Sequence, residues 1–481
     1  MSRKWSKYQK KIFAFVESGE GNAVIEAVAG SGKTTTIVEG MSRIPAGKSS
    51  IFLAFNKSIA EELKKRGVNA KTFHSLCYSP VTRARNVRTV NDQKIRGLID
   101  QLLGDSAWKY GAFLQRLVGL GKNCGIDALL PDTAEVWAQI IDHHDLELDH
   151  DDASEAFAIG FASQVLSMSN MVHDVDFDDL LYLAVKDGIT LPKFDFVFVD
   201  EAQDTNAIQR AILKKILNKG ARLVAVGDPA QAIYGFRGSD NNALDYILRD
   251  FGGIKLPLTV SYRCPTSVVA HAQQWVSHIE AAPNAPAGKV ESKGLDWDAK
   301  DFVASDIVVC RTTQPLVSLA YEMMSKRIPV KILGRDIGRG LVALINKMKA
   351  KGVPALIEKL EAYTAREMER AIAKGKEGKA DQISDKTSCV MFLIKTLDEN
   401  NRTIPELIRV IENLFGDKAN VTMLSTIHKA KGLEADRVYW LNSSACPSKW
   451  ARQDWQRQQE MNLCYVATTR AKQELILIER E

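Results

Sequence analysis

The sequence predicts an α/β protein with two parallel-sheet domains, each carrying a mainly helical insertion. Short apolar, β-branched runs recur along the chain, and such unbroken runs are typical of strands buried on both faces of a parallel sheet. They alternate with helix-like stretches and fall into two series, so each series is compatible with its own sheet. The length of 481 residues also exceeds one ordinary domain, for which roughly 150 residues is the prior.

The first series of predicted strands lies in the N-terminal half and the second in the C-terminal half. The first comprises AVIEAVA (23–29), IFLAF (51–55), FDFVFVD (194–200) and RLVAVGD (222–228). The second comprises IKLPL (254–258), DIVVCR (306–311), PVKIL (329–333), VTMLST (421–426), RVYWLN (437–442) and ELILIE (474–479). Between strands of the first series we expect helices over 59–67 and 207–220, the latter ending in glycine as helices often do.

Two long stretches of helical pattern interrupt the series and predict an insertion in each domain. The expected boundaries are 1–80 and 176–252 for the first core domain, 81–175 for its insertion, 253–339 and 419–481 for the second core domain, and 340–418 for its smaller insertion.

Composition excludes several classes of protein. Hydrophobic residues make up 45% and charged residues 26% of the chain, close to globular averages, which argues against a disordered or collagen-like chain. The formal net charge is only +5, so any nucleic-acid surface must be local. The seven cysteines include no CxxC pair, which favours reduced thiols over a metal cluster. No apolar run approaches the roughly 18 residues of a membrane span, so we expect a cytoplasmic protein without membrane contact.

The sharpest motif is AVAGSGKTTT, at residues 27–36. It follows the first predicted strand and opens a helix, which is the context of a P-loop. The glycines let backbone N–H groups approach phosphate oxygens, and the helix N-terminus adds favourable partial charge. Lys33 can reach the β- and γ-phosphates, and the Thr34 hydroxyl can bind Mg²⁺. The predicted phosphate-binding residues are Ala29, Gly30, Ser31, Gly32, Lys33, Thr34 and Thr35.

A second motif, FVFVDEAQD at 196–204, places two carboxylates at the end of an apolar strand. Ligands bind at this edge of open α/β sheets. Asp200 suits the Mg²⁺ shell, and Glu201 suits a base that orients or activates water. Gln231 follows another strand and could sense the γ-phosphate or the attacking water. Gln9 could bind adenine, because a glutamine amide can both donate to the base and accept from it. A single glutamine is a weaker signal than the motifs above.

In their order along nearly the whole chain, these motifs resemble those of superfamily 1 helicases of the UvrD/PcrA/Rep type. The family P-loop commonly reads AxAGSGKT, which fits Ala27, and DEAQD is its acidic motif. The other matching segments are AFNKSIAEEL (54–63), KTFHSL (71–76), LVGLGKNCGID (117–127), DFDDLL (176–181), VGDPAQAIYGFRG (226–238), SYRCP (261–265), STIHKAKGLEADRV (425–438) and LCYVATTRAK (463–472). The resemblance implies two RecA-like core domains, with ATP and Mg²⁺ as cofactors.

The resemblance also implies residue roles. Gln9 would contact adenine, Tyr262 would stack on it, and Glu434 would bind the ribose, with Gly432, two positions earlier in the same motif, also at the nucleotide. Arg263 and Arg470 would reach the γ-phosphate from the second core domain, and an arginine finger is worth roughly 10³–10⁵ in rate. With these arginines, the predicted catalytic residues are Lys33, Asp200, Glu201, Gln231, Arg263 and Arg470.

This sequence departs from the family pattern at several positions. Thr35 stands where the family often has Arg, which leaves the preference for adenine open. Phe236 replaces a Trp in the segment 226–238, which the resemblance implies couples ATP to DNA, and Ser261 replaces an Asn before Tyr262. The second insertion is about half of the usual size.

Single strands are held by aromatic faces that stack on bases and by basic groups that follow phosphates. The family motifs place Phe55, Phe73, Tyr234 and Phe236 for stacking, and Asn56, His74, Arg237 and His428 for polar and cationic contacts. Core packing is the alternative for each aromatic ring, and for Phe73 the two are evenly balanced. Trp450 and Trp455 could form a duplex-separating wedge on a β-hairpin, or could be buried by an amphipathic helix.

We expect an ATP-dependent DNA helicase or single-strand translocase, with 3′-to-5′ movement implied by the resemblance. Its partners would be single-stranded DNA and tailed duplex DNA. Three alternatives remain open: a motor subunit that strips proteins or serves a partner nuclease, a P-loop switch that is not a motor, and an RNA helicase of the same superfamily.

Overall fold

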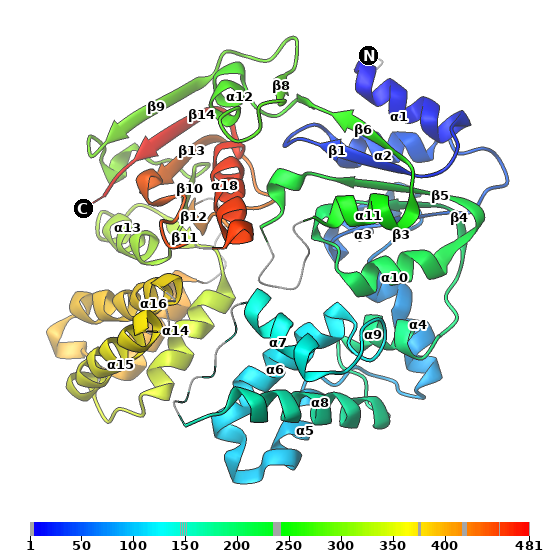
Figure 1. Cartoon of the computed structure of the whole chain (residues 1–481). Coiled ribbons are helices and arrows are strands. Elements are labelled where there is room, and N and C mark those ends of the chain that lie inside the picture. The colour runs from blue at the N-terminus through cyan, green and yellow to red at the C-terminus, as the bar shows by residue number, and fades with distance from the viewer. Residues whose placement is uncertain are drawn as a thin grey trace. The chain divides into compact units, whose positions relative to one another are not determined.

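The computed structural model describes residues 4–144, 146, 148, 150, 152–233, 242–373, 377–415, 421–451 and 453–480 (Figure 1). Contacts divide the chain into two compact units. Unit 1 comprises residues 1–28 and 32–259, and unit 2 comprises residues 29–31 and 260–481. Each unit contains one six-stranded sheet, in which every strand pair is parallel. The predicted α/β class with two parallel sheets is confirmed.

The sheet of unit 1 has the strand order β3-β2-β4-β5-β1-β6. Its strands are β1 (Ala23–Ala27), β2 (Ser50–Leu53), β3 (Ala70–Lys71), β4 (Phe194–Val199), β5 (Leu217–Gly227) and β6 (Ile254–Leu258). Because side chains alternate along a strand, neighbouring residues enter different cores. Val197 and Val199 join the core beneath the helical insertion, whereas Phe196 and Phe198 pack on the opposite face. Both faces are therefore covered, as a parallel sheet requires.

The helices of unit 1 fall into two groups. Those that pack on the second face are α1 (Lys7–Ser18), α2 (Lys33–Met41) and α3 (Lys57–Lys65). The others are α4 (Phe73–Ala84), α5 (Lys94–Leu103), α6 (Ala107–Cys124), α7 (Ala134–His143), α8 (Glu155–Met171), α9 (Asp179–Lys186), α10 (Ala207–Ile216) and α11 (Ala243–Phe251), with short 3₁₀ turns η1 (Gly104–Ser106), η2 (Ala202–Asp204) and η3 (Pro229–Gln231). Figure 1 shows α5–α8 gathered in one helical group, and one hydrophobic core runs from the sheet into that group.

The sheet of unit 2 has the order β11-β12-β10-β13-β14-β9, and β7 pairs with β8 separately. The strands are β7 (Val260–Ser261), β8 (Glu280–Ala281), β9 (Lys289–Gly294), β10 (Ile307–Cys310), β11 (Val330–Ile332), β12 (Thr422–Thr426), β13 (Ala435–Leu441) and β14 (Ala471–Ile478). The helices are α12 (Thr266–Ala272), α13 (Gln314–Ser325), α14 (Arg335–Lys347), α15 (Val353–Ala373), α16 (Glu377–Thr396), α17 (Ile404–Leu414) and α18 (Asp454–Thr468), with η5 (Ala299–Asp301), η6 (Glu399–Asn401) and η7 (Ser443–Ala445).

Two predicted elements are placed differently in the structure. The run 254–258 was expected in the second series, but as β6 it pairs with β1 in the first sheet. An apolar run shows that a strand is buried, but it does not show which sheet buries it. The helix predicted over 207–220 ends at Ile216, and the chain then enters β5. The bounds of the six predicted segments stay a prediction, although the division between the units falls after residue 259.

Among the described residues, no helix is long and apolar enough to cross a membrane. Six cysteines are buried and Cys124 is partly buried, as expected for thiols in an interior.

Candidate nucleotide and DNA sites

The P-loop forms the turn between β1 and α2. Gly32 precedes the first residue of α2 with φ 76°, and Gly30 has φ 72°. Glycine adopts this left-handed conformation without the steric cost of a Cβ atom. The first N–H groups of α2 have no partner within the helix, and together with the helix dipole they favour an anion. This turn is suited to phosphate.

Two contacts join the P-loop helix to the end of β4. Lys33 Nζ lies 3.3 Å from Glu201 Oε1. The Thr34 hydroxyl donates to Asp200 Oδ2 over 3.0 Å. The structure therefore brings together the four residues that the sequence assigned to phosphate, Mg²⁺ and water.

Burial and charge shift the pKa values of this group in physically consistent directions. Burial alone would lower the pKa of Lys33, but the charges of Glu201, Asp228 and Asp200 outweigh it and raise that pKa. Burial, with the charge of Glu201, raises the pKa of Asp200 to about 6, although Lys33 and Thr34 act against the shift. A divalent cation at Asp200 would relieve this excess of negative charge.

Gln203 connects two acidic residues of the site. Its Nε2 donates to Glu201 Oε2 over 2.5 Å, and its Oε1 accepts the Asp228 N–H over 3.0 Å. A Cβ atom on Gly227 would lie 2.4 Å from Gln203 Oε1, so the close passage of this amide requires glycine there. Gln231 Nε2 in turn donates to Asp228 Oδ2 over 2.6 Å. Gln203 and Asp228 received no role from the sequence, although both lie inside motifs that it identified.

Gln9 is buried and contacts the P-loop helix. Its Nε2 donates to the Thr36 hydroxyl over 3.0 Å, and its Oε1 accepts the Ser6 N–H over 3.0 Å. Thr36 donates to the Gly32 carbonyl over 2.9 Å. Gln9 therefore ties α1 to the phosphate-binding turn. Thr35 is half-buried on the same helix.

The residues present fit a nucleotide with Mg²⁺. Within the described part of the chain, the buried Ser31 hydroxyl has no hydrogen-bond partner, as expected of a group that awaits a ligand. Ala29 beside it is also buried. The described residues contain no group of three or more His, Cys, Asp or Glu side chains that could hold a metal ion. Thr34 and Asp200 could hold Mg²⁺, which proteins usually bind through one or two carboxylates together with the phosphates of the substrate.

In unit 2, Arg263 and Glu434 form an ion pair. Arg263 Nε lies 2.7 Å from Glu434 Oε2, and Lys472 Nζ lies 2.7 Å from Glu434 Oε1. Partial burial would raise the pKa of Glu434, but Lys472 and Arg263 outweigh it and lower that pKa. Tyr262, which precedes Arg263, is 48% exposed, so its ring is accessible for stacking. Gly432 has φ 89° and lies two positions before Glu434.

Arg470 follows α18 and is 1% exposed. Its guanidinium donates to the Val466 carbonyl over 2.9 Å, the Leu433 carbonyl over 3.2 Å and the Thr469 hydroxyl over 3.2 Å. The Thr469 carbonyl also accepts from Arg263 Nη1 over 3.3 Å. The two arginines assigned to the γ-phosphate thus share Thr469 as a neighbour.

The residues predicted to bind DNA divide by exposure. Phe55, after β2, is 48% exposed. The Asn56 side-chain oxygen caps α3 by accepting the Ile59 N–H over 2.9 Å. Phe73 is 7% exposed and belongs to the hydrophobic core of unit 1, which favours the core-packing alternative for this ring.

His74 stacks on Phe177, with ring centroids 3.9 Å apart and an interplanar angle of 18°. Phe177 is 55% exposed. Burial lowers the pKa of His74 to about 4. The DNA contact assigned to His74 stays a prediction. The sequence analysis gave Phe177 no role. Its position between acidic residues in DFDDLL could have indicated an exposed aromatic ring at a turn.

The remaining predicted residues are less informative. Tyr234, Phe236 and Arg237 lie outside the described residues. His428 is half-buried after β12. Trp450 lies before α18 and Trp455 within it, both partly buried. No strand occurs in the described residues between η7 and α18, so the expected β-hairpin is not formed there; the wedge role stays a prediction.

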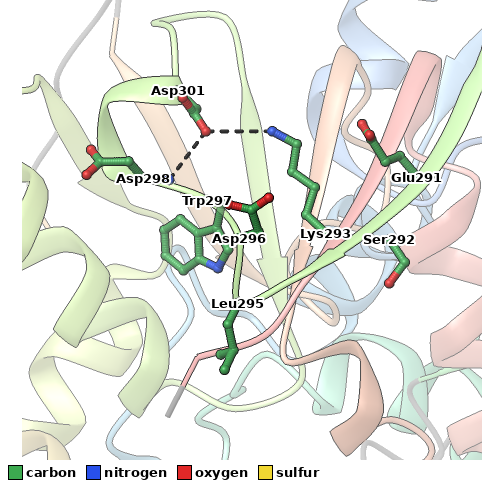
Figure 2. A pocket seen from close by; sticks show the side chains of 8 residues that line it. All are labelled: Glu291, Ser292, Lys293, Leu295, Asp296, Trp297, Asp298 and Asp301. Atoms are coloured by element: carbon green, nitrogen blue, oxygen red, sulfur yellow. Dashed lines mark hydrogen bonds and ion pairs between the residues drawn. The ribbon is translucent and has the colours of Figure 1, made fainter.

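Figure 2 shows a pocket of about 550 Å³ in unit 2, beside β9. The lining residues are Glu291, Ser292, Lys293, Leu295, Asp296, Trp297, Asp298 and Asp301. Lys293 Nζ lies 3.7 Å from Asp301 Oδ2, and that oxygen also accepts the Asp298 N–H over 3.3 Å. None of the residues predicted for nucleotide or DNA lines this pocket.

A P-loop joined to an acidic strand end, together with a second parallel-sheet unit, defines a P-loop NTPase with two α/β cores. The UvrD/REP helicase N-terminal domain matches residues 8–252, and the UvrD-like helicase C-terminal domain matches residues 353–481. The chain belongs to the UvrD/REP helicase family, and its two sheets are the RecA-like cores of a superfamily 1 helicase.

Several named relatives are similar to the chain. A probable DNA helicase II homolog of Mycoplasma pneumoniae is 25% identical, with 98% of this chain and 84% of the relative covered. The F-box DNA helicase 1 of Gallus gallus is 24% identical, with 94% of this chain and 47% of the relative covered. The ATP-dependent DNA helicase PcrA of Staphylococcus epidermidis is 26% identical, with 55% of this chain and 39% of the relative covered. The chain thus spans most of the first relative and less than half of the other two.

Proposed function

We propose that the protein is an ATP-dependent DNA helicase that moves along single-stranded DNA and unwinds duplex DNA. The observation that supports this most directly is the joined set of Lys33, Thr34, Asp200 and Glu201 in unit 1, in a chain of the UvrD/REP helicase family. The named relatives, which are described as DNA helicases, support DNA rather than RNA as the substrate. The resemblance to the UvrD/PcrA/Rep type favours 3′-to-5′ movement.

In unit 1, each contact of the site has a role in hydrolysis. Thr34 and Asp200 would hold Mg²⁺, which neutralises charge on the phosphates and helps to orient them. Lys33, now 3.3 Å from Glu201, would turn its ammonium to the β- and γ-phosphates. Glu201 then becomes available to orient the attacking water. Gln203 holds the Glu201 carboxylate from the side of Asp228, which fixes the direction of that base.

In unit 2, Arg263 and Arg470 are proposed to act on the γ-phosphate of the same nucleotide. Arg263 is paired with Glu434, so this pair must open for Arg263 to reach a phosphate. Release of Glu434 would let its carboxylate accept from the ribose. Because both arginines respond to the γ-phosphate, hydrolysis would change the interaction between the units, which is the basis of a motor stroke.

For the DNA, we propose stacking on Phe55 and on the Phe177 ring that His74 supports. Base–aromatic stacking is worth roughly 1–3 kcal/mol per base and tolerates any sequence. A neutral His74 suits this role, because its flat face supports Phe177 without requiring a phosphate counterion. Phe236 would add a further stacking contact.

The test compares ATP hydrolysis without nucleic acid and with single-stranded DNA, single-stranded RNA and blunt duplex DNA. We expect single-stranded DNA, but neither single-stranded RNA nor blunt duplex DNA, to stimulate ATP hydrolysis strongly. We also expect the protein to unwind duplexes that carry a 3′ tail. Equal stimulation by RNA would favour an RNA helicase. DNA-stimulated hydrolysis without unwinding would favour a motor subunit that works with other proteins, and hydrolysis indifferent to nucleic acid would favour a P-loop switch.

A further inference from the structure

One polar contact in unit 1 links the segment after the acidic motif to the helical insertion. Asn206 Nδ2 donates to Asn123 Oδ1 over 2.8 Å. Asn206 is buried and caps α10, where its side chain accepts the Gln209 N–H over 2.9 Å. Asn123 lies on α6, in the last turn before the helix ends at Cys124. Neither asparagine has a role in the nucleotide or DNA contacts proposed above.

On one side, Asn206 is joined to Glu201 by a short and internally bonded segment. The Asp204 N–H donates to the Glu201 carbonyl over 3.0 Å, and the Thr205 hydroxyl donates to the Ala202 carbonyl over 2.8 Å. Ala202, Thr205 and Asn206 are buried. Since close-packed interiors deform little, a shift of Glu201 is carried to Asn206.

On the other side, Asn123 lies against the turn that precedes α9. Asn123 Nδ2 donates to Asp178 Oδ1 over 3.4 Å. The preceding Lys122 Nζ lies 2.6 Å from the carboxylates of both Asp176 and Asp179. Three carboxylates of this turn are therefore held by adjacent residues of α6.

Phe177 stands inside the same turn. Its ring points outward, 55% exposed, and stacks on His74. The carboxylates that flank Phe177 are held from α6, so the turn that carries this ring is tied to that helix. Asn123 thus lies between the segment that follows Glu201, in the proposed ATP site, and the Phe177 ring, in the proposed DNA-binding surface.

We propose that Asn123 is a positioning residue that couples the loop of Glu201 to the turn of Phe177. The proposal rests on the proposed function, since it gives Glu201 to ATP and Phe177 to DNA. Rearrangement of Glu201 on nucleotide binding pulls or releases Asn206, and Asn123 transmits that change to the stacking face. A purely structural contact would support stability and leave the two ligands independent of this residue.

The test measures the coupling factor, which is the ratio of single-stranded DNA dissociation constants without and with a non-hydrolysable ATP analogue. Coupling factors of about 5- to 150-fold are typical of linked sites, and linkage requires the same factor for the analogue when DNA is added. Both titrations are made on the full-length chain. The melting temperature of each variant is recorded without ligand.

Three variants and one control separate coupling from folding. Asn123→Ala removes the contacts with Asn206 and Asp178, and with them the bond that Asn123 Nδ2 donates to the Gly119 carbonyl of its own helix over 2.9 Å. Asn206→Ser removes the amide donor and keeps a good helix cap. The double variant completes the cycle. Asn170→Ala is the control, because Asn170 of the insertion donates to Asp127 and to Tyr182 on α9, and among the described residues it has no hydrogen bond to Asn206 or Asp178.

We expect both single variants to lower the coupling factor by at least about threefold, with the double variant no worse than either, as for residues in direct contact. Asn170→Ala should keep the wild-type factor. Wild-type coupling in Asn123→Ala or Asn206→Ser would overturn the proposal and leave the proposed function intact. If Asn123→Ala does not fold, the coupling factor of Asn206→Ser alone decides between these outcomes. A wild-type protein in which analogue and DNA bind independently would overturn both.

Discussion

Lys33 Nζ lies 3.3 Å from Glu201 Oε1, so the residue proposed to bind phosphate and the residue proposed to orient water form an ion pair. The pair compensates two partly buried charges, and burial alone would lower the pKa of Lys33. Binding of ATP would exchange the partner of Lys33 from Glu201 to phosphate. Binding of ATP would thus release the Glu201 carboxylate from Lys33.

The first prediction follows from this exchange. Glu201→Gln should bind ATP at least as well as the wild type, because Lys33 loses a competing anion, but should not turn it over. Lys33→Ala should lose both binding and turnover, since it removes the cation at the β- and γ-phosphates. Equilibrium binding of ATP and steady-state hydrolysis distinguish the two variants. Wild-type turnover in Glu201→Gln would mean that another residue orients the water.

The second prediction concerns Gln203, which holds the Glu201 carboxylate. A hydrogen bond to a charged group contributes roughly 1.5–3 kcal/mol. Gln203→Ala should therefore lower kcat by roughly 10- to 150-fold, with the KM for ATP within about twofold of wild type. Steady-state kinetics at saturating single-stranded DNA measure this. A raised KM with normal kcat would show that Gln203 serves binding rather than the orientation of the base.

The third prediction concerns the arginines of unit 2. Arg263→Ala and Arg470→Ala should each lower DNA-stimulated kcat by at least about tenfold, a small share of a full arginine-finger effect. Arg437→Ala is the matched control, because Arg437 on β13 pairs with Asp306 and has no proposed role at the nucleotide. If both variants hydrolysed ATP as fast as this control, unit 2 would not complete the ATP site.

The fourth prediction concerns pH. Burial lowers the pKa of His74 from 6.5 to about 4, so between these values the unfolded chain binds more protons than the folded chain. The contribution of His74 to the free energy of unfolding is therefore fully present above pH 6.5, and it is lost as the pH falls toward 4. His74→Phe should show a smaller drop in melting temperature between pH 7 and pH 5 than the wild type, with single-stranded DNA binding retained. A histidine resonance of His74 that titrates near pH 6.5 would contradict this.

The fifth prediction concerns the buried charges of the insertion. Lys122 holds Asp176 and Asp179, and breaking a buried pair costs about 3–5 kcal/mol because a charge is left uncompensated. Lys122→Met should lower the unfolding free energy by about this amount, and adding Asp179→Asn should recover part of it. Denaturant unfolding of the three proteins measures the loss and the recovery. An unchanged midpoint for Lys122→Met would show that the ion pairs do not stabilise the fold.

The sequence predicted the motifs better than the geometry between them. Apolar runs indicated most strands of both sheets, and GSGKT with DEAQD indicated the nucleotide site. The edge strand β9 was missed because its residues, KVESKG, are polar and partly exposed, and β6 was assigned to the wrong sheet because strand pairing is a long-range property. The link from Gln203 to Asp228 and the support of Phe177 by His74 both join residues far apart in sequence. Spacing alone contains no signal for such contacts.

Unwinding of a 3′-tailed duplex by the wild type and by Glu201→Gln, with a 5′-tailed duplex as the matched substrate, decides whether the protein is an ATP-driven helicase that moves 3′ to 5′. We expect the wild type to separate the 3′-tailed duplex only with ATP and Mg²⁺, and Glu201→Gln to bind the same DNA without separating it. Strand separation by Glu201→Gln at the wild-type rate, or no separation of either duplex by a wild type that hydrolyses ATP, would contradict this expectation.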